Sequence, residues 1–444
     1  MADEVFADAS PEKRLFISLL SRDISLVEAI LDILDNSVNS ALEPYADRLR
    51  TAVDYEALLD DETVEPKCSI SITFDKDHLR IKDDASGISA EHAEKTVFKF
   101  GRPDQFSAKG DRLSVYGIGL KRAVFKIGDT IKIRSEHRDG GFFLDLKVSD
   151  WAKLEQTRWG FPIEPLKPAK STGTEIEVRN FHSDIAKRFR DGLLEGQLRE
   201  QIAKIYALFI GRVINISVNG KPVDGLSFNV GSNMTTQSFR EGGVDCTVKA
   251  GVANQTDGRF RDSGSGWFVF CNGRNVIFGD KSRLTGWANN GLPIFQPKHR
   301  PFLGLVFFFS EDPELLPWTT TKADINEESD SWQRALKTMV VVGRTVLKFL
   351  DNRYTNEGTV ASPEEVNEAS GQKVSMLKAA AGSAKTVFQP PRAPRPQKIR
   401  IQYEAKVDDI KRIERYLKKP GMGGSGVGRY TFQYFLDNEV GEED

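Results

Sequence analysis

Residues 25–42 have the sequence SLVEAILDILDNSVNSAL, and this stretch decides the fold. Its apolar residues recur at the spacing of an α-helix that is buried along most of its surface. Ser25 suits the N-cap position, and Glu28, three residues later, completes a capping box. The stretch therefore predicts a helix that begins near Ser25 and ends near Leu42.

The polar residues of this helix form one stripe. Glu28, Asp32, Asn36 and Asn39 follow one another at spacings of four, four and three residues, so they share a helix face, with Asp35 beside them. A solvated face normally also carries lysine or arginine, and this helix has neither. Because Mg2+ takes oxygen ligands together with substrate phosphates, the stripe indicates a magnesium site. An ordinary amphipathic helix is the alternative.

Two glycine-containing segments follow this helix. Residues 81–88, IKDDASGI, end a predicted strand with an acid and small residues, which let a flat ring approach the backbone while a carboxylate accepts from an amine. Residues 116–121, YGIGLK, open a predicted helix whose free backbone N–H groups can meet phosphate. Each segment alone could also be a simple turn. The chain has no GxxxxGK[ST] sequence, so a P-loop is excluded.

In order and spacing, these segments resemble the motifs of the GHKL superfamily of gyrase, heat-shock chaperone, histidine kinase and MutL ATPases. DILDNS at residues 32–37 is similar to the first motif, and DDASG at 83–87 is similar to the DxGxG motif. GIG at 117–119 is similar to the end of the third motif, and STGTEI at 171–176 to the fourth. The resemblance covers about residues 10–180. It implies a Bergerat fold, an α/β sandwich with a mixed sheet and helices on one face.

The resemblance also implies which residues would bind ATP and Mg2+. Asp32 would take the position of the general base, and Asn36 would bind Mg2+. Asp83 would accept a hydrogen bond from the adenine amine, with Thr174 supporting it. Residues 100–116 would form the lid over the nucleotide. The other nucleotide contacts would come from Gly87, Gly117, Ile118, Gly119, Leu120 and Lys121.

The sequence departs from the family pattern at three positions. Asp32 stands where the base is usually glutamate, so its side chain is one methylene shorter. A displacement of ~1 Å can cost about 100-fold in rate, so we expect either slow hydrolysis or an Asp32 that acts through an extra water. Glu28, one turn further away, is an alternative base. Ala85 replaces the first glycine of the DxGxG motif, and Asn39 replaces an acid common in gyrase-like members.

Two later segments resemble parts of the transducer domain of MutL, gyrase and MORC-type ATPases. FCNGRNVI at residues 270–277 is similar to its NxR segment. PWTTTKAD at residues 317–324 is similar to the loop that brings a lysine to the ATP γ-phosphate, and that lysine would be Lys322. An exposed surface lysine is the alternative for this residue alone. The resemblance implies a MORC- or MutL-like layout with a transducer-like α/β domain.

Length and composition bound the domain organisation. The chain has 444 residues and a formal net charge of −2, so it has room for two or three domains and gives no overall signal for nucleic acid. We expect an α+β protein, and its transducer-like domain should include a strand at 214–218. The expected divisions are an ATP-binding domain at 1–185, a transducer-like domain at 186–352, a linker rich in Pro, Gly, Ala and Ser at 353–396, and a basic and aromatic tail at 397–444.

Features that would place the chain outside the cytoplasm are missing from the sequence. No apolar run approaches the ~20 residues of a membrane span, and the N-terminus lacks the pattern of a signal peptide. The three cysteines are far apart and give neither a disulfide framework nor a zinc pattern. We therefore expect a cytoplasmic protein without a membrane partner.

The leading functional hypothesis is a conformational switch driven by ATP binding and slow hydrolysis. Relatives of this kind close as dimers through N-terminal segments, and residues 5–22, with Phe6, Leu15, Phe16 and Leu19, could do so here. The alternative is that these residues pad their own domain. The expected partners are a second copy, bound in the presence of ATP, and an unidentified protein.

Three other functional classes remain open. They are a nucleotide-gated binding module with little hydrolysis, a chaperone-like client binder and a DNA-acting clamp. Basic residues outnumber acidic ones between Arg392 and Lys419, which would suit a nucleic-acid contact. A solvated interaction helix is an equal alternative for this tail.

Overall fold

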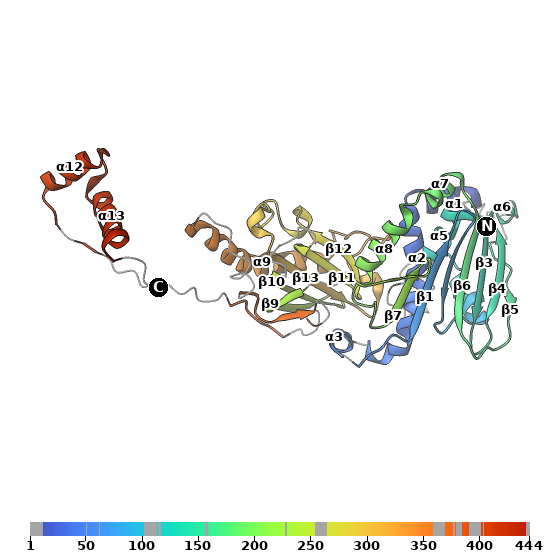
Figure 1. The fold of residues 1–444 in the computed structure, drawn as a ribbon. Coiled ribbons are helices and arrows are strands. Elements are labelled where there is room, and N and C mark those ends of the chain that lie inside the picture. Colours follow the sequence, from blue (N-terminus) through green and yellow to red (C-terminus); the bar gives the residue numbers. More distant parts are fainter. Residues whose placement is uncertain are drawn as a thin grey trace, which may run out of the picture. The chain divides into compact units, whose positions relative to one another are not determined.

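The computed structural model divides the chain into two compact units, residues 1–391 and residues 392–444. Figure 1 shows the elements of both. The residues that the structure describes are 12–49, 51–61, 63–101, 113, 117–155, 159–226, 229–253, 264–357, 369–375, 378, 384–389, 401–402 and 404–440.

An eight-stranded mixed sheet forms the first part of the larger unit, with strand order β5-β4-β3-β6-β2-β1-β7-β8. All of its neighbouring strands are antiparallel except β1 and β7, which are parallel. The strands are β1 (Cys68–Phe74), β2 (His78–Asp83), β3 (Gly128–Glu136), β4 (Phe142–Lys147), β5 (Glu164–Pro165), β6 (Gly173–Phe181), β7 (Ile214–Val218) and β8 (Lys221–Val223).

The helices that pack on this sheet do so through apolar residues. α2 (Leu26–Leu42) and α5 (Gly119–Ile127) pack against each other, and they contact β2, β3 and β6. Nearly all of the apolar residues of α2 are buried, which explains its mostly apolar sequence. The other helices are α1 (Lys13–Arg22), η1 (Glu43–Arg48), α3 (Ala52–Asp60), α4 (Ala90–His92), the π-helical turn η2 (Ala93–Val97), α6 (Val148–Trp151), α7 (Ser183–Arg190) and α8 (Leu194–Ile205).

A second mixed sheet follows, with strand order β12-β11-β13-β10-β9-β14. The long helix α9 (Asp330–Glu357) packs on β9, β10 and β13. The strands are β9 (Asn229–Glu241), β10 (Val244–Ala253), β11 (Gly266–Cys271), β12 (Arg274–Asp280), β13 (Phe302–Phe309) and β14 (Lys373–Ser375), and the 3-10 turns are η4 (Arg283–Thr285), η5 (Pro297–His299) and η6 (Pro313–Leu315). The expected α+β class is confirmed.

Two sequence-based assignments are wrong. The strand at 214–218 belongs to the first sheet, because β7 pairs in parallel with β1 and buries Ile214, Ile216 and Val218. The segment assigned to a linker is partly folded: β14 pairs with β9, and Phe388 is buried against Phe349. Its few apolar residues are enough to cover an edge of the second sheet, and composition alone hides them.

The smaller unit, described by itself, is a helical pair. It contains α12 (Val407–Tyr416), α13 (Gly423–Phe435) and the π-helical turn η7 (Leu436–Val440). Val427 is buried between these elements, whereas Tyr416, Phe432 and Tyr434 are exposed. Of the helices in the part of the chain that the structure describes, none has both the length and the apolar character to cross a bilayer.

Candidate functional site

Helix α2 begins as its sequence predicts. Ser25 caps it, accepting from the backbone N–H of Glu28 at 3.2 Å, and the Glu28 carboxylate accepts from the Ser25 N–H at 2.8 Å. This commits the Glu28 carboxylate to the first turn of the helix, away from the middle of the polar stripe. The structure therefore gives no support to Glu28 as a replacement base.

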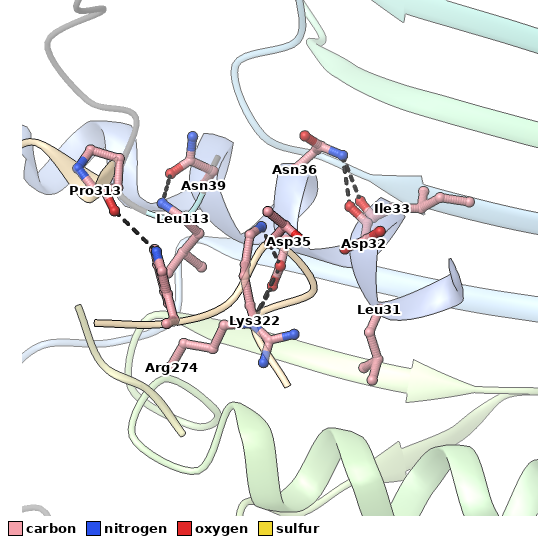
Figure 2. A network of polar contacts seen from close by, with 12 residues as sticks. Leu31, Asp32, Ile33, Asp35, Asn36, Asn39, Leu113, Arg274, Pro313 and Lys322 are labelled. Carbon is pink, nitrogen blue, oxygen red and sulfur yellow. Dashed lines mark hydrogen bonds and ion pairs between the residues drawn. The ribbon is translucent and has the colours of Figure 1, made fainter. Parts of the chain in front are cut away.

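Asn36 presents its amide oxygen away from the helix. Its side-chain nitrogen donates to the backbone carbonyl of Asp32 at 2.8 Å and to that of Ile33 at 3.5 Å (Figure 2). The oxygen is thereby the end that can accept a metal ion. Within the described ranges, no group of three or more His, Cys, Asp or Glu side chains could hold a metal by itself. A magnesium ion here would therefore need phosphate oxygens and water as its other ligands.

Asp83, at the end of β2, is held by neutral donors. Its carboxylate accepts from the Ser37 hydroxyl at 2.7 Å and from the backbone N–H groups of Ala85 at 3.2 Å and Thr174 at 3.1 Å. Burial raises the pKa of Asp83, and these hydrogen bonds offset part of the rise. A carboxylate offers about four acceptor positions, so this geometry leaves capacity for the amine of a bound ring.

Thr174 contributes through its backbone, while its side chain does something else. The Thr174 hydroxyl bonds the Ser135 hydroxyl at 2.9 Å, and the Ser135 hydroxyl accepts from the Ile88 N–H at 2.7 Å. These bonds tie β3 and β6 to the loop that follows Asp83. The expected support of Asp83 is thus a direct backbone hydrogen bond plus a side-chain brace.

Gly87 is required by close packing of that same loop. It has a φ of 72°, and a Cβ added to it would lie 2.0 Å from the carbonyl oxygen of Glu136. Any larger residue would push the loop away from β3. The structure therefore gives Gly87 a backbone role in holding this loop against β3, beside the nucleotide contact that the sequence suggests.

The glycine segment opens α5 beside Asp32. Gly117 has a φ of 62°, Ile118 is the N-cap, and the helix begins at Gly119. A Cβ on Gly119 would lie 3.7 Å from the Asp32 carboxyl carbon. The first backbone N–H groups of a helix have no acceptor within it, so those at Gly119, Leu120 and Lys121 form a natural anion site next to the acid.

The Lys121 side chain is buried in this structure. Its amino group donates to the backbone carbonyls of Val97 at 2.8 Å and Lys99 at 2.6 Å, so it braces the start of the lid segment. Burial lowers its pKa to about 7. A direct phosphate contact by this amino group would require both hydrogen bonds to break.

Asn39 also acts on the lid. Its side-chain oxygen accepts from the backbone N–H of Leu113 at 3.1 Å, and Leu113 is fully buried (Figure 2). The rest of the predicted lid, apart from residues 100, 101 and 113, lies outside the described residues. An amide at this position of α2 therefore anchors the lid segment, where gyrase-like relatives carry an acid.

Asp32, the predicted base, forms a buried ion pair. Its carboxylate accepts from Arg122 Nε at 2.6 Å, and both side chains are almost fully buried. Burial raises the pKa of Asp32, and the hydrogen bond from Arg122 opposes that rise. In this state the carboxylate is engaged by the protein.

Asp35 joins the two sheet regions. Lys322 Nζ donates to its Oδ2 at 2.8 Å, Arg274 Nε to its Oδ1 at 3.1 Å, and the Tyr206 hydroxyl to Oδ1 at 2.6 Å. The Lys322 and Arg274 side chains converge on Asp35 from the second region (Figure 2). Burial alone would raise the pKa of Asp35, but the charges of Arg274 and Lys322 outweigh it and hold that pKa below its usual value. Lys322, predicted to reach a γ-phosphate, pairs with an aspartate instead.

The sequence predicts no role for three residues that contact Asp32 or form the network around Asp35. Asp35 stands there only as a neighbour of the polar stripe, and no motif contains Tyr206 or Arg122. A signal did exist for two of them: Asp35 is a charge among apolar helix residues, and Arg122 directly follows the glycine segment. Tyr206 lies 171 positions from Asp35 and gave no local signal.

Comparison with known families agrees with this geometry. Residues 24–179 match the family model described as histidine kinase-, DNA gyrase B-, and HSP90-like ATPase. This part of the chain is thus an ATPase domain of the GHKL type, a class that binds ATP. The match ends before β7 and the second sheet. A search among curated proteins returned no match.

Proposed function

We propose that the chain binds Mg–ATP and hydrolyses it slowly, and that this cycle switches the contact between the ATPase domain and the second sheet. The observation that carries the proposal is the pairing of Lys322 with Asp35, which adjoins the metal-binding candidate Asn36 in the sequence. A lysine that can form an ion pair with either a buried aspartate or a bound phosphate would change its partner when nucleotide binds.

The residues present fit the groups of Mg–ATP. Asp83 offers an acceptor for the adenine amine, and Asn36 offers an amide oxygen to the ion. The start of α5 offers backbone N–H groups to phosphate. Bound Mg2+ would supply neutralisation of phosphate charge. Asp32, beside Gly119, is the acid nearest to this helix start among the residues that we assign to the site.

Charge balance supports the exchange of Lys322. Two carboxylates, Asp32 and Asp35, share their buried surroundings with three cations, Arg122, Arg274 and Lys322. The cluster therefore has one excess positive charge, which favours the approach of an anion. Lys322 also has a φ of 54°, an uncommon backbone conformation for lysine. Because its backbone conformation is strained and its amino group already pairs with an anion, we expect Lys322 to be able to exchange Asp35 for a bound phosphate.

The proposed output is closure of two copies of the chain. On α1, Phe16 packs against Phe100 and Trp159, so this residue pads its own domain. Leu15 and Leu19, one turn apart, are exposed and available to a second copy. Phe6 lies outside the described residues. A MORC- or MutL-like clamp and a transducer role for the second sheet remain part of this proposal.

A gated binding module with little turnover is the second candidate. It is favoured by one observation, the tight pairing of Asp32 with Arg122, which occupies the carboxylate that would act as base. In that case nucleotide binding alone would set the state of the contact.

Steady-state ATP hydrolysis tests the proposal. Wild type should turn over with Mg2+, and Asp32→Asn should bind nucleotide but lose about 10²–10⁴-fold in rate, the usual contribution of a general base. Light scattering with a non-hydrolysable ATP analogue should show a doubled mass. Binding without turnover would favour the gated module, and an unchanged mass at every concentration would exclude the clamp.

A further inference from the structure

One arginine connects the predicted base to the loop that carries Lys322. Arg122 Nε donates to Asp32 Oδ2 at 2.6 Å, while Arg122 Nη2 donates to the backbone carbonyl of Thr320 at 3.3 Å. Asp32 and Arg122 are both more than nine-tenths buried. The guanidinium therefore bridges α2 and the second region of the same unit.

The loop around Thr320 is a closed turn that should move as one piece. The Thr319 N–H donates to the Asp324 carbonyl at 2.9 Å, and the Lys322 N–H donates to the Thr319 carbonyl at 2.9 Å. The Trp318 indole anchors the base of the turn on the Pro313 carbonyl at 3.0 Å. Because the turn is closed in this way, a movement of the Lys322 backbone away from Asp35 would carry the Thr320 carbonyl with it.

Among the described residues, the side chain that hydrogen-bonds the Asp32 carboxylate is Arg122. A Cβ on Gly119 would lie 3.7–3.8 Å from the Asp32 side chain, which is ordinary van der Waals distance, so Gly119 does not lock the carboxylate in place. The orientation of Asp32 therefore depends on what Arg122 does. A guanidinium is planar and presents several N–H groups in a fixed fork, which suits two acceptors at once. A lysine at the same place would be a single point charge.

We propose that Arg122 is a positioning residue that sets the orientation of Asp32 according to the position of the Lys322 loop. When the loop holds Thr320 against the guanidinium, Arg122 keeps Asp32 in its paired orientation. When the loop moves, Arg122 loses one of its two acceptors and re-aims the carboxylate. This inference rests on the proposed function, because it takes Asp32 as the base and Lys322 as the mobile lysine.

Variants at Arg122 separate positioning from simple structural support. We would compare Arg122→Lys, which keeps the charge, with Arg122→Gln, which removes it, using full-length protein and measuring kcat, KM for ATP and the unfolding midpoint. Arg134→Gln is the matched control, since Arg134 pairs with Glu136 on an exposed part of β3. We expect both Arg122 variants to lose at least about 10-fold in kcat, within the range for a displaced general base. KM should stay within about threefold, and Arg122→Lys should unfold near the wild-type midpoint.

A double-mutant cycle tests the link to the loop. If Arg122 and Lys322 act through one connection, the losses in kcat of Arg122→Gln and Lys322→Met should be clearly less than multiplicative in the double variant. Multiplicative losses, or a wild-type kcat for Arg122→Lys, would overturn the inference while leaving the proposed function intact. Wild-type turnover by Asp32→Asn, or no turnover by wild type, would overturn the proposed function and this inference together.

Discussion

Two buried aspartates, one on helix α2 and one bonded to it, have pKa values shifted in opposite directions. Asp83 contacts α2 through Ser37 and is surrounded by a hydroxyl and two backbone N–H groups, all neutral. Asp35, on α2 itself, is surrounded by Arg274, Lys322 and the Tyr206 hydroxyl. The pKa of Asp83 is raised by burial, whereas the pKa of Asp35 is lowered by the charges that face it.

This difference separates hydrogen bonds made within one domain from ion pairs made between two sheet regions. The donors to Asp83 all come from residues 37–174, within the matched ATPase domain, so the hydrogen bonds to this carboxylate are complete without the second sheet. The charged partners of Asp35 come from positions 239 and 287 residues later in the chain. In the proposed cycle, the ATPase domain would therefore bind ATP by itself, and Asp35 would respond to the position of the second region.

The largest effect should come from Asp35→Asn. Removing this charge would leave Arg274 and Lys322 buried without their shared carboxylate, and breaking a buried pair in this way typically costs about 3–5 kcal/mol. We expect a loss of that size in the free energy of unfolding, measured by urea denaturation. Asp145→Asn, at an exposed pair with Lys132, is the matched control and should change little.

The double variant Asp35→Asn with Lys322→Met sharpens this test. It removes one of the two stranded cations, so it should recover part of the lost stability. A single Asp35→Asn variant as stable as wild type would contradict the ion pairs of Asp35 with Arg274 and Lys322.

A smaller effect, confined to binding, should come from Asp83→Asn. The change removes a charged acceptor, and hydrogen bonds to charged groups are worth about 1.5–3 kcal/mol, which corresponds to roughly 10–100-fold in ATP affinity. A fluorescent ATP analogue with competition by ATP and GTP would measure both the loss and the reduced preference for adenine. Asp84→Asn is the matched control, because exposed Asp84 accepts from the Ser69 N–H. Equal losses at both positions would place the adenine amine elsewhere.

The same comparison explains what the sequence could predict. The capping box, the polar stripe and the glycine segments are local patterns, and helix α2 and the start of α5 lie where those patterns place them. The parallel pairing of β7 with β1 and the convergence on Asp35 are not local, because they join residues far apart in the chain. No spacing rule connects Tyr206 or Arg274 to Asp35.

Lys121 shows that a sequence motif does not determine the direction of a long side chain. The glycine segment predicts free backbone N–H groups at the helix start, and it also suggests that the lysine beside them points to phosphate. The side chain instead enters the core and ends on the Val97 and Lys99 carbonyls. Which way a long side chain turns depends on where its hydrogen-bond acceptors lie. The Val97 and Lys99 carbonyls reach their positions beside Lys121 through folding, and the motif does not specify those positions.

The smallest predicted effect concerns Lys121, a buried cation whose hydrogen-bond acceptors are neutral. In the described part of the chain, the hydrogen-bond acceptors of the Lys121 amino group are the carbonyl oxygens of Val97 and Lys99, and burial lowers its pKa from 10.5 to about 7. Between those two values the unfolded chain binds more protons at this site than the folded protein does. The free energy of unfolding should therefore rise with pH, by up to ~1.4 kcal/mol per pH unit from this group. Below about pH 7 the penalty for burying the charge is fully present.

Urea denaturation of wild type and Lys121→Met at pH 7, 8 and 9 isolates this contribution, because other titrating groups are common to both proteins. We expect the stability of wild type relative to the variant to increase at each step. Lys132→Met, at a half-exposed amino group paired with Asp145, is the control and should give a nearly constant difference. A constant difference for Lys121→Met as well would mean that its amino group stays protonated through this range. That result would show that neutral carbonyl acceptors are enough to keep the buried Lys121 amino group charged. The opposite pKa shifts of Asp83 and Asp35 would then need a cause other than whether their partners are neutral or charged.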